Sequence, residues 1–171
     1  MTCSSCGGAT TERIAGAAEP YGYAINGLRG LQLIGIHVRR CETCAAESPL
    51  IPRIEELHRV IARELLMRRT LLTGDELRFL RKHAGFPAAR FAALLGVSAA
   101  HLSRFENGHA GNNLGAPADR LARALVAAAS AGEDLRTVLL DRAGPVGRRR
   151  KRPRPVLAAF RLVRNRWRHA A

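Results

Sequence analysis

Four cysteines constrain this chain more than any other feature, and all four lie before residue 45 of 171. They form two Cys-x-x-Cys pairs, Cys3 with Cys6 and Cys41 with Cys44. Each pair can place both sulfurs on one metal ion from a tight knuckle, and two pairs complete a tetrahedral site of four thiolates. The spacing therefore predicts a zinc ribbon over residues 1–50 with one structural Zn²⁺ per chain, which leaves no open coordination position for catalysis.

Disulfides, a redox-active pair and unused thiols are the alternatives for these cysteines. The segment Met1–Gly8 is polar and holds two of the cysteines, so it does not have the pattern of a signal peptide, and this argues against disulfides. A redox pair would stand beside a βαβ pattern, which the sequence does not show. Alternating apolar residues predict short strands around 21–25 and 34–38, with a turn between them at Gly27 and Gly30.

Charge is distributed very unevenly along the chain. The 28 basic and 14 acidic side chains give a formal net charge of +14. Residues 1–50 are neutral overall, whereas residues 143–171 carry ten basic side chains and no acidic one. A chain of this kind is expected to meet a polyanion, either nucleic acid or an acidic membrane surface. No uncharged apolar run reaches the ~18 residues of a membrane span.

Helical periodicity begins after Pro52. Apolar residues from Ile54 to Leu65 recur at helical spacing and predict a linker helix within residues 51–70. Thr73 and Glu76 have the spacing of a capping box, so a second helix should start at Thr73 and stop near Gly85. Further helices are expected over residues 87–96, 98–107, 116–131 and 133–142. The helix over 116–131 is expected to bury Leu121, Leu125 and Ala128.

The string Leu95-Gly96-Val97-Ser98 joins two of these helices and predicts a helix-turn-helix within residues 71–142. Gly96 allows the tight turn, and Ser98 caps the following helix. Arg104 on that helix can contact a guanine or a phosphate. A plain helical bundle is the alternative. The residues expected to face DNA are Arg90, Ser98, Ala99, Ala100, His101, Ser103, Arg104 and Asn107.

Residues 143–171 form the fourth expected region, a basic tail. The run Arg148–Arg154 excludes a folded interior and predicts disorder until a partner arrives. Beyond it, Val156, Phe160, Val163 and Trp167 stand at helical spacing among arginines, which predicts a basic amphipathic helix if the segment orders. Such a helix can lie on the DNA backbone, an acidic membrane or a partner protein. An unstructured tail is the alternative.

The order of these parts resembles the MqsA/YgiT-type family of zinc-finger helix-turn-helix antitoxins over roughly residues 1–130. The motifs that carry the likeness are the two cysteine pairs, Leu95-Gly96-Val97-Ser98 and Ser103-Arg104-Phe105-Glu106-Asn107-Gly108. The last of these is typical of the wider Xre-like helix-turn-helix. The expected fold is mainly α: a small N-terminal β zinc ribbon, an all-α Xre-like helix-turn-helix domain and the basic tail.

The resemblance implies a bacterial, dimeric transcriptional repressor that binds a palindromic operator. It also implies a small partner, a RelE-like mRNA-cleaving ribonuclease toxin that this protein neutralises. Alternatives are a regulator without a toxin and a pure protein-interaction module. The sequence shows no nucleophile–base pairing, no phosphate-cradling glycine motif and no open metal site, so an enzyme is not expected. A DNA-binding repressor is expected in the cytoplasm, associated with the nucleoid.

Overall fold

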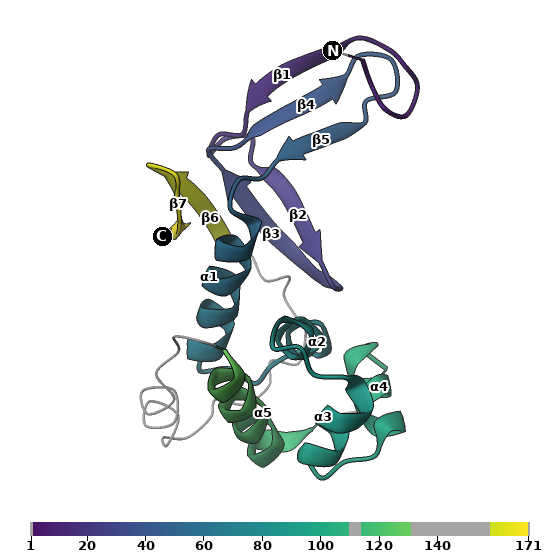
Figure 1. Ribbon diagram of the computed structural model, residues 1–171, viewed down its shortest axis with the longest axis vertical. Helices are drawn as coiled ribbons and strands as arrows, with labels where there is room; N and C mark the ends of the chain where they lie inside the picture. Colours follow the sequence, from purple (N-terminus) through teal and green to yellow (C-terminus); the bar gives the residue numbers. More distant parts are fainter. Residues whose placement is uncertain (1, 110–113, 131–157, 171) are drawn as a thin grey trace. The chain divides into compact units, whose positions relative to one another are not determined.

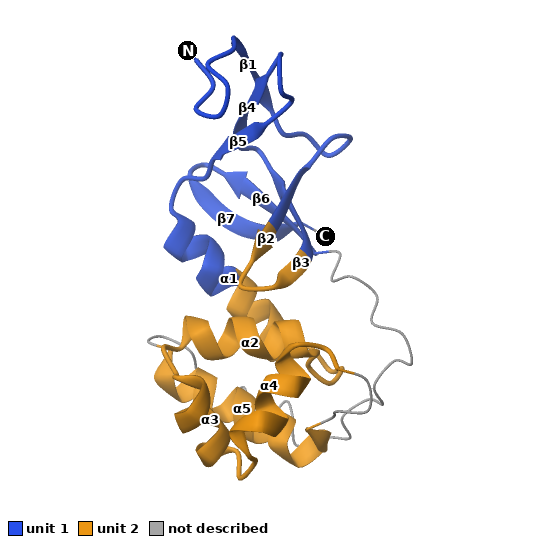
Figure 2. Cartoon of the chain, turned by 90° about the vertical axis from the view of Figure 1, so that its right-hand side faces the viewer, with its two compact units in different colours: residues 1–23, 30–60, 156–171 blue, residues 24–29, 61–155 orange. Residues whose placement is uncertain are grey.

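Seven strands and five helices are formed by residues 2–109, 114–130 and 158–170, the part of the chain that this computed structural model describes (Figure 1). Contacts divide the chain into two compact units (Figure 2). Unit 1 comprises Met1–Tyr23, Gly30–Val60 and Val156–Ala171, and unit 2 comprises Ala24–Arg29 and Ile61–Pro155.

The first sheet of unit 1 has the strand order β1-β4-β5. Its strands are β1 (Thr10–Ile14), β4 (His37–Cys41) and β5 (Glu47–Leu50), and both pairings are antiparallel. Thr10 lies opposite Cys41, so the register brings the chain that follows the first cysteine pair beside the second pair. The sequence did not predict β1 or β5, because their short, charged segments show no run of alternating apolar residues.

The second sheet joins segments from the two ends of the chain. Its order is β2-β3-β6-β7, formed by β2 (Tyr21–Ile25), β3 (Leu28–Ile34), β6 (Ala158–Val163) and β7 (Arg166–Ala170). Strand β6 runs parallel to β3 and antiparallel to β7. Leu33 pairs with Phe160, and both side chains are completely buried. The core of this sheet is therefore shared between residues more than a hundred positions apart.

This arrangement corrects the expected tail helix. Phe160 and Trp167 lie on two antiparallel strands rather than on one helix, and the indole Nε1 of Trp167 donates to the carbonyl of Pro52 at 2.9 Å. A two-residue turn, Arg164-Asn165, joins the strands, and both residues have the positive φ that such turns require. Spacing of three and four residues fits a helix, but the available sheet edge at β3 favoured strands. The predicted run Arg148–Arg154 lies outside the described residues.

The expected ribbon is also corrected. The predicted strand 34–38 is broken at Gly35, which has a φ of +84° and donates to the carbonyl of Ala15 at 2.8 Å. Residues before the break join the sheet with the C-terminal hairpin, whereas residues after it join the cysteine-bearing sheet. The sheet that carries the cysteines thus lies within residues 1–50, but residues 21–34 belong to the second sheet, and the fold is a mixture of β and α structure.

The five helices follow in order along the chain. They are α1 (Ile54–Met67), α2 (Gly74–His83), α3 (Ala88–Leu94), α4 (Ala99–Glu106) and α5 (Gly115–Ala129). The capping box at Thr73 and the Ser98 cap are confirmed, with hydrogen bonds of 3.3 Å to the Glu76 N–H and 3.1 Å to the His101 N–H. No helix in the described ranges is long and apolar enough to cross a membrane.

Helix α5 faces the core with a different side from the one expected. Leu121 is 41% exposed, whereas Arg123 is 1% exposed and Asp119 is 5% exposed. These two buried charges form an ion pair of 2.7 Å. The face of α5 that carries this ion pair is the inward one. The prediction from the spacing of apolar residues placed Leu121 inward instead. The predicted helix 133–142 lies outside the described residues.

We expect Phe160→Ala to destabilise unit 1 by about 3–5 kcal/mol, because a fully buried aromatic ring leaves a cavity when it is truncated. Val163→Ala is the matched control, because Val163 is on the same strand but 39% exposed, and it should cost less than about 1 kcal/mol. Urea unfolding followed by the fluorescence of Trp167, the chain's single tryptophan, measures both. Equal losses would contradict the packing of β6 described above.

Candidate functional site

The four cysteine sulfurs converge at one end of the β1-β4-β5 sheet. All four Sγ atoms lie within 4.8 Å of one another. The Sγ atoms of Cys6 and Cys41 are 3.4 Å apart, and those of Cys3 and Cys44 are 3.7 Å apart. A disulfide would need a separation of about 2.05 Å. Four sulfurs at Zn–S distances of about 2.3 Å stand roughly 3.8 Å apart in a tetrahedron, so the cluster can hold a metal ion.

Two tight turns aim backbone N–H groups at the sulfurs. Ser5 N–H donates to Cys3 Sγ at 3.4 Å, and this hydrogen bond lowers the pKa of the Cys3 thiol. The backbone N–H of Cys44, aided by that of Thr43, lowers the pKa of Cys41 to about 6 against the opposing effect of burial. Metals bind thiolates rather than thiols, so these N–H groups favour the metal-binding form of Cys3 and Cys41.

The residue after each cysteine pair has a positive φ. Gly7 follows the first pair with a φ of +73°, and Ala45 follows the second pair with a φ of +55°. Both residues therefore take the left-handed conformation, in which an alanine is strained. Gly8 has a different constraint, because a Cβ there would lie 2.5 Å from Thr43 Oγ1 and 3.3 Å from Cys41 Sγ. A side chain at position 8 would therefore require Thr43 and Cys41 to shift.

Helices α2 to α4 form the second candidate site, and α5 packs against α2. Gly96 between α3 and α4 has a φ of +69°, which makes the tight turn that the sequence predicted. A Cβ at Gly74 would lie 2.0 Å from the backbone oxygen of Phe105, so the start of α2 and the end of α4 are in very close contact. Leu102 and Phe105 anchor α4 in the core, and its other face is exposed.

A comparison with protein families matches residues 73–139 to a family described as a helix-turn-helix domain. The chain contains a helix-turn-helix domain. The match covers α2 to α5 and extends into residues that the structure does not describe. No curated protein and no solved structure matches the chain.

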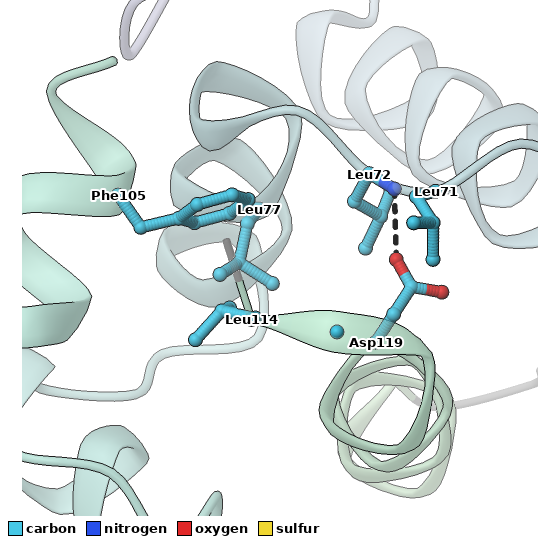
Figure 3. Close-up of a pocket in the computed structure, with 7 residues that line it drawn as sticks. Leu71, Leu72, Leu77, Phe105, Leu114 and Asp119 are labelled. Carbon is cyan, nitrogen blue, oxygen red and sulfur yellow. Dashed lines mark hydrogen bonds between the residues drawn. The ribbon is translucent and has the colours of Figure 1, made fainter. Parts of the chain in front are cut away.

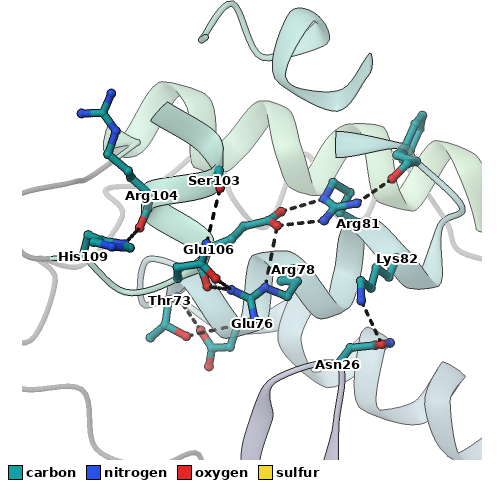
Figure 4. Close-up of polar contacts among 12 residues, drawn as sticks. Asn26, Thr73, Glu76, Arg78, Arg81, Lys82, Ser103, Arg104, Glu106 and His109 are labelled. Carbon is teal, nitrogen blue, oxygen red and sulfur yellow. Dashed lines mark hydrogen bonds and ion pairs between the residues drawn. The ribbon is translucent and has the colours of Figure 1, made fainter. Parts of the chain in front are cut away.

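The helix-turn-helix domain exposes the residues predicted to face DNA. The exposed members are Arg90, Ser98, Ala99, Ala100, Ser103, Arg104 and Asn107, and His101 is partly exposed. The Arg104 guanidinium points away from the polar cluster beneath α4 (Figure 4). Asn107 is less available, because Arg78 donates to its Oδ1 at 2.6 Å and its Nδ2 donates to Ser103 Oγ at 3.4 Å.

A buried ion pair beneath α4 is the feature that the sequence analysis missed. Arg81 on α2 makes a two-point contact with Glu106, with distances of 2.7 and 2.8 Å, and also donates to the carbonyl of Phe86. The hydrogen bond with Glu106 raises the pKa of Arg81. Arg78 adds contacts to the backbone of Glu106. These contacts hold the end of α4 against α2. Glu106 belongs to the motif Ser103–Gly108, and that motif was the sequence feature that could have indicated its role.

A second buried pair fixes α5 to the end of α1. Asp119 accepts from the backbone N–H of Leu72 at 2.7 Å, beside a small pocket (Figure 3). Arg123 donates to the carbonyls of Leu65 and Leu66 in the last turn of α1 and to that of Thr70 beyond it, at 2.6–2.9 Å. The pocket is otherwise apolar, lined by Leu71, Leu72, Leu77, Phe105, Leu114 and Gly115. The carboxylate of Asp119 already accepts hydrogen bonds within the domain, so we interpret the pocket as a gap between packed helices and not as a binding site.

Gly8→Ala should weaken metal retention roughly tenfold, because the added methyl group pushes Thr43 and Cys41 out of position. Gly16→Ala is the control, since no atom lies within 4 Å of a Cβ at that position. Metal loss to a competing chelator, followed with a metallochromic dye, measures both variants. Similar loss from both would show that Gly8 does not limit the geometry of the cysteine cluster.

Glu106→Gln should destabilise the helix-turn-helix domain by about 3–5 kcal/mol, because it leaves the buried Arg81 charge without its partner. Glu55→Gln removes one carboxylate from an exposed position on α1 and should cost less than about 1 kcal/mol. Thermal unfolding followed by far-ultraviolet circular dichroism gives both values. A loss for Glu106→Gln no larger than that of the control would contradict the role of this ion pair.

Proposed function

We propose that this protein is a sequence-specific DNA-binding transcriptional repressor. The observation that carries the proposal is the exposed face of α4, where small and polar residues surround Arg104 while Leu102 and Phe105 hold the helix in the core. A recognition helix needs this division, because one face must enter the major groove while the other is fixed to the domain.

The N-terminal end of α4 is suited to close approach. Ala99 and Ala100 are exposed and have short side chains, so the backbone can come near the floor of the groove. The Ser98 oxygen caps the helix, and its hydroxyl proton stays available for a phosphate. Arg104 supplies either a two-point contact to guanine or a phosphate contact, and Arg90 on α3 adds charge toward the backbone.

A dimer on a palindromic operator follows from the size of this reading surface. One short helix reads only a few base pairs, and helix-turn-helix proteins extend the site by pairing two copies across half-sites about one helical turn apart. The cysteine cluster, in this proposal, holds one structural Zn²⁺ through Cys3, Cys6, Cys41 and Cys44. The ion would tie two knuckles at the end of a small sheet, and no catalytic role is proposed for it or for the chain.

The antitoxin role rests on the order of parts. A four-cysteine cluster followed by an Xre-like helix-turn-helix resembles the MqsA/YgiT-type family, whose members neutralise RelE-like ribonucleases. We propose such a small toxin as the partner of unit 1, and the cytoplasm, on the nucleoid, as the place of action. Co-purification from native cells tests this: a stoichiometric small protein encoded beside the gene supports it, and the gene's promoter without such a protein leaves a stand-alone repressor.

Arg104→Ala should lose about 1–3 kcal/mol of binding free energy on the preferred operator and little on scrambled duplex. The operator is first selected from a random duplex library with the full-length protein, and the selected sites should be two-fold symmetric. Arg69→Ala removes another exposed arginine, one outside α4, and should change neither affinity. Equal losses on both duplexes for Arg104→Ala would overturn base reading by this residue.

A further inference from the structure

The C-terminal hairpin presents three arginines on one side of its sheet. Strand alternation and the β6–β7 register place Arg161, Arg166 and Arg168 on the same face, and all three are exposed. We call these three residues the arginine face. The opposite face carries Phe160 and Trp167, both buried, and Trp167 is bonded to Pro52 just before α1. One side of the sheet is thus covered and the other is open.

The arginine face has no counter-charge in its own sheet. Strands β2, β3, β6 and β7 contain four arginines and no aspartate or glutamate. No ion pair joins the arginine face to any of the residues that the structure describes. The other sheet of unit 1 differs, since Arg13 pairs with Glu47 at 3.2 Å and Arg39 with Glu12 at 3.8 Å.

The register adds an electrostatic cost. Arg161 lies directly opposite Arg168 across the two strands. Like charges in that position destabilise a sheet pair, and a bound anion removes the repulsion. A structural role explains Phe160 and Trp167, which form the core. It does not explain three arginines on the solvent side that have no ion-pair partner among the described residues.

The chemistry of this face selects among possible polyanions. Single-stranded nucleic acid is held by stacking on aromatic rings, but the aromatic residues of β6 and β7 are buried on the opposite face. A membrane-surface element inserts large apolar side chains, and Val163, only 39% exposed, is the one apolar residue exposed among the arginines. Guanidinium groups alone suit the phosphates of a duplex, which are contacted without stacking or insertion.

We propose that the arginine face is a second DNA-contacting surface, which binds duplex phosphates independently of sequence and so supplements the helix-turn-helix domain. The inference rests on the proposed function, because it assigns the same duplex to both surfaces. It assigns a division of roles: α4 discriminates between sequences, and the hairpin contributes affinity that is strongly salt-dependent.

The test compares two triple variants of the full-length protein. The hairpin variant carries Arg161→Gln, Arg166→Gln and Arg168→Gln. The control carries Arg40→Gln, Arg63→Gln and Arg69→Gln, which removes the same charge from exposed, scattered positions. Affinities for the selected operator and for scrambled duplex are measured across a range of salt concentrations.

The hairpin variant should lose the same factor of affinity on both duplexes. Its slope of log affinity against log salt should become shallower by roughly 2–3, since each neutralised phosphate contributes about 0.9. The control should change the slope by less than about 1. The hairpin variant should also unfold at or above the wild-type temperature, because the repulsion between positions 161 and 168 is removed.

If the slope of log affinity against log salt is the same for both triple variants, the proposal is overturned. The loss of affinity would then come from the reduced net charge of the protein and not from the arginine face. An unchanged affinity of the hairpin variant for duplex, with lost binding to vesicles of phosphatidylserine and phosphatidylcholine, would overturn it in favour of a membrane surface. Wild-type protein that binds no duplex would overturn the proposed function and this inference together, whereas duplex binding that the hairpin variant retains in full overturns this inference alone.

Discussion

The parallel pairing of β6 with β3 is the interaction on which unit 1 depends. It places Phe160 against Leu33 in the core and brings Trp167 to the carbonyl of Pro52. Without it, β2 and β3 would be an isolated hairpin, which is marginal in water. The same pairing directs alternate residues of β6 and β7 to solvent, so the core contact also creates the arginine face. The pairing of β3 with β6 therefore determines both which residues form the core of unit 1 and which arginines face solvent.

In unit 2, buried ion pairs fix the helices beside an apolar core that includes Phe79, Phe91 and Phe105. Glu106 joins α4 to α2 through Arg81, and Asp119 joins α5 to the Leu65–Thr70 segment through Arg123. Helices α3 and α5 are rich in alanine, so the two ion pairs add contacts where these helices supply few large side chains. Two-point charged contacts have a defined geometry, which holds the exposed face of α4 in one orientation.

The cysteine cluster and the helix-turn-helix domain were both predictable, because their signals are local. A Cys-x-x-Cys pair positions two sulfurs whatever the rest of the fold does, and the sulfurs did converge. Thr73, Gly96 and Ser98 act through their nearest backbone neighbours, and their caps and turn were confirmed. The inward face of α5 was not predictable, because a buried Arg123 depends on partners in α1 that a helical pattern does not contain.

The sequence by itself determined the local units: the cysteine knuckles, the helix caps, the tight turn before α4 and the imbalance of charge toward the C-terminus. The tertiary structure alone decided what the C-terminal segment became. Phe160 and Trp167 suit one helix by their spacing, and they share one face of a sheet only because the turn at Arg164-Asn165 lies between them. The edge of β3, with which β6 pairs, favours the hairpin over the helix. Neither the sequence of β3 nor that of β6 indicates this pairing, because the free energy of pairing is gained only when the two strands meet.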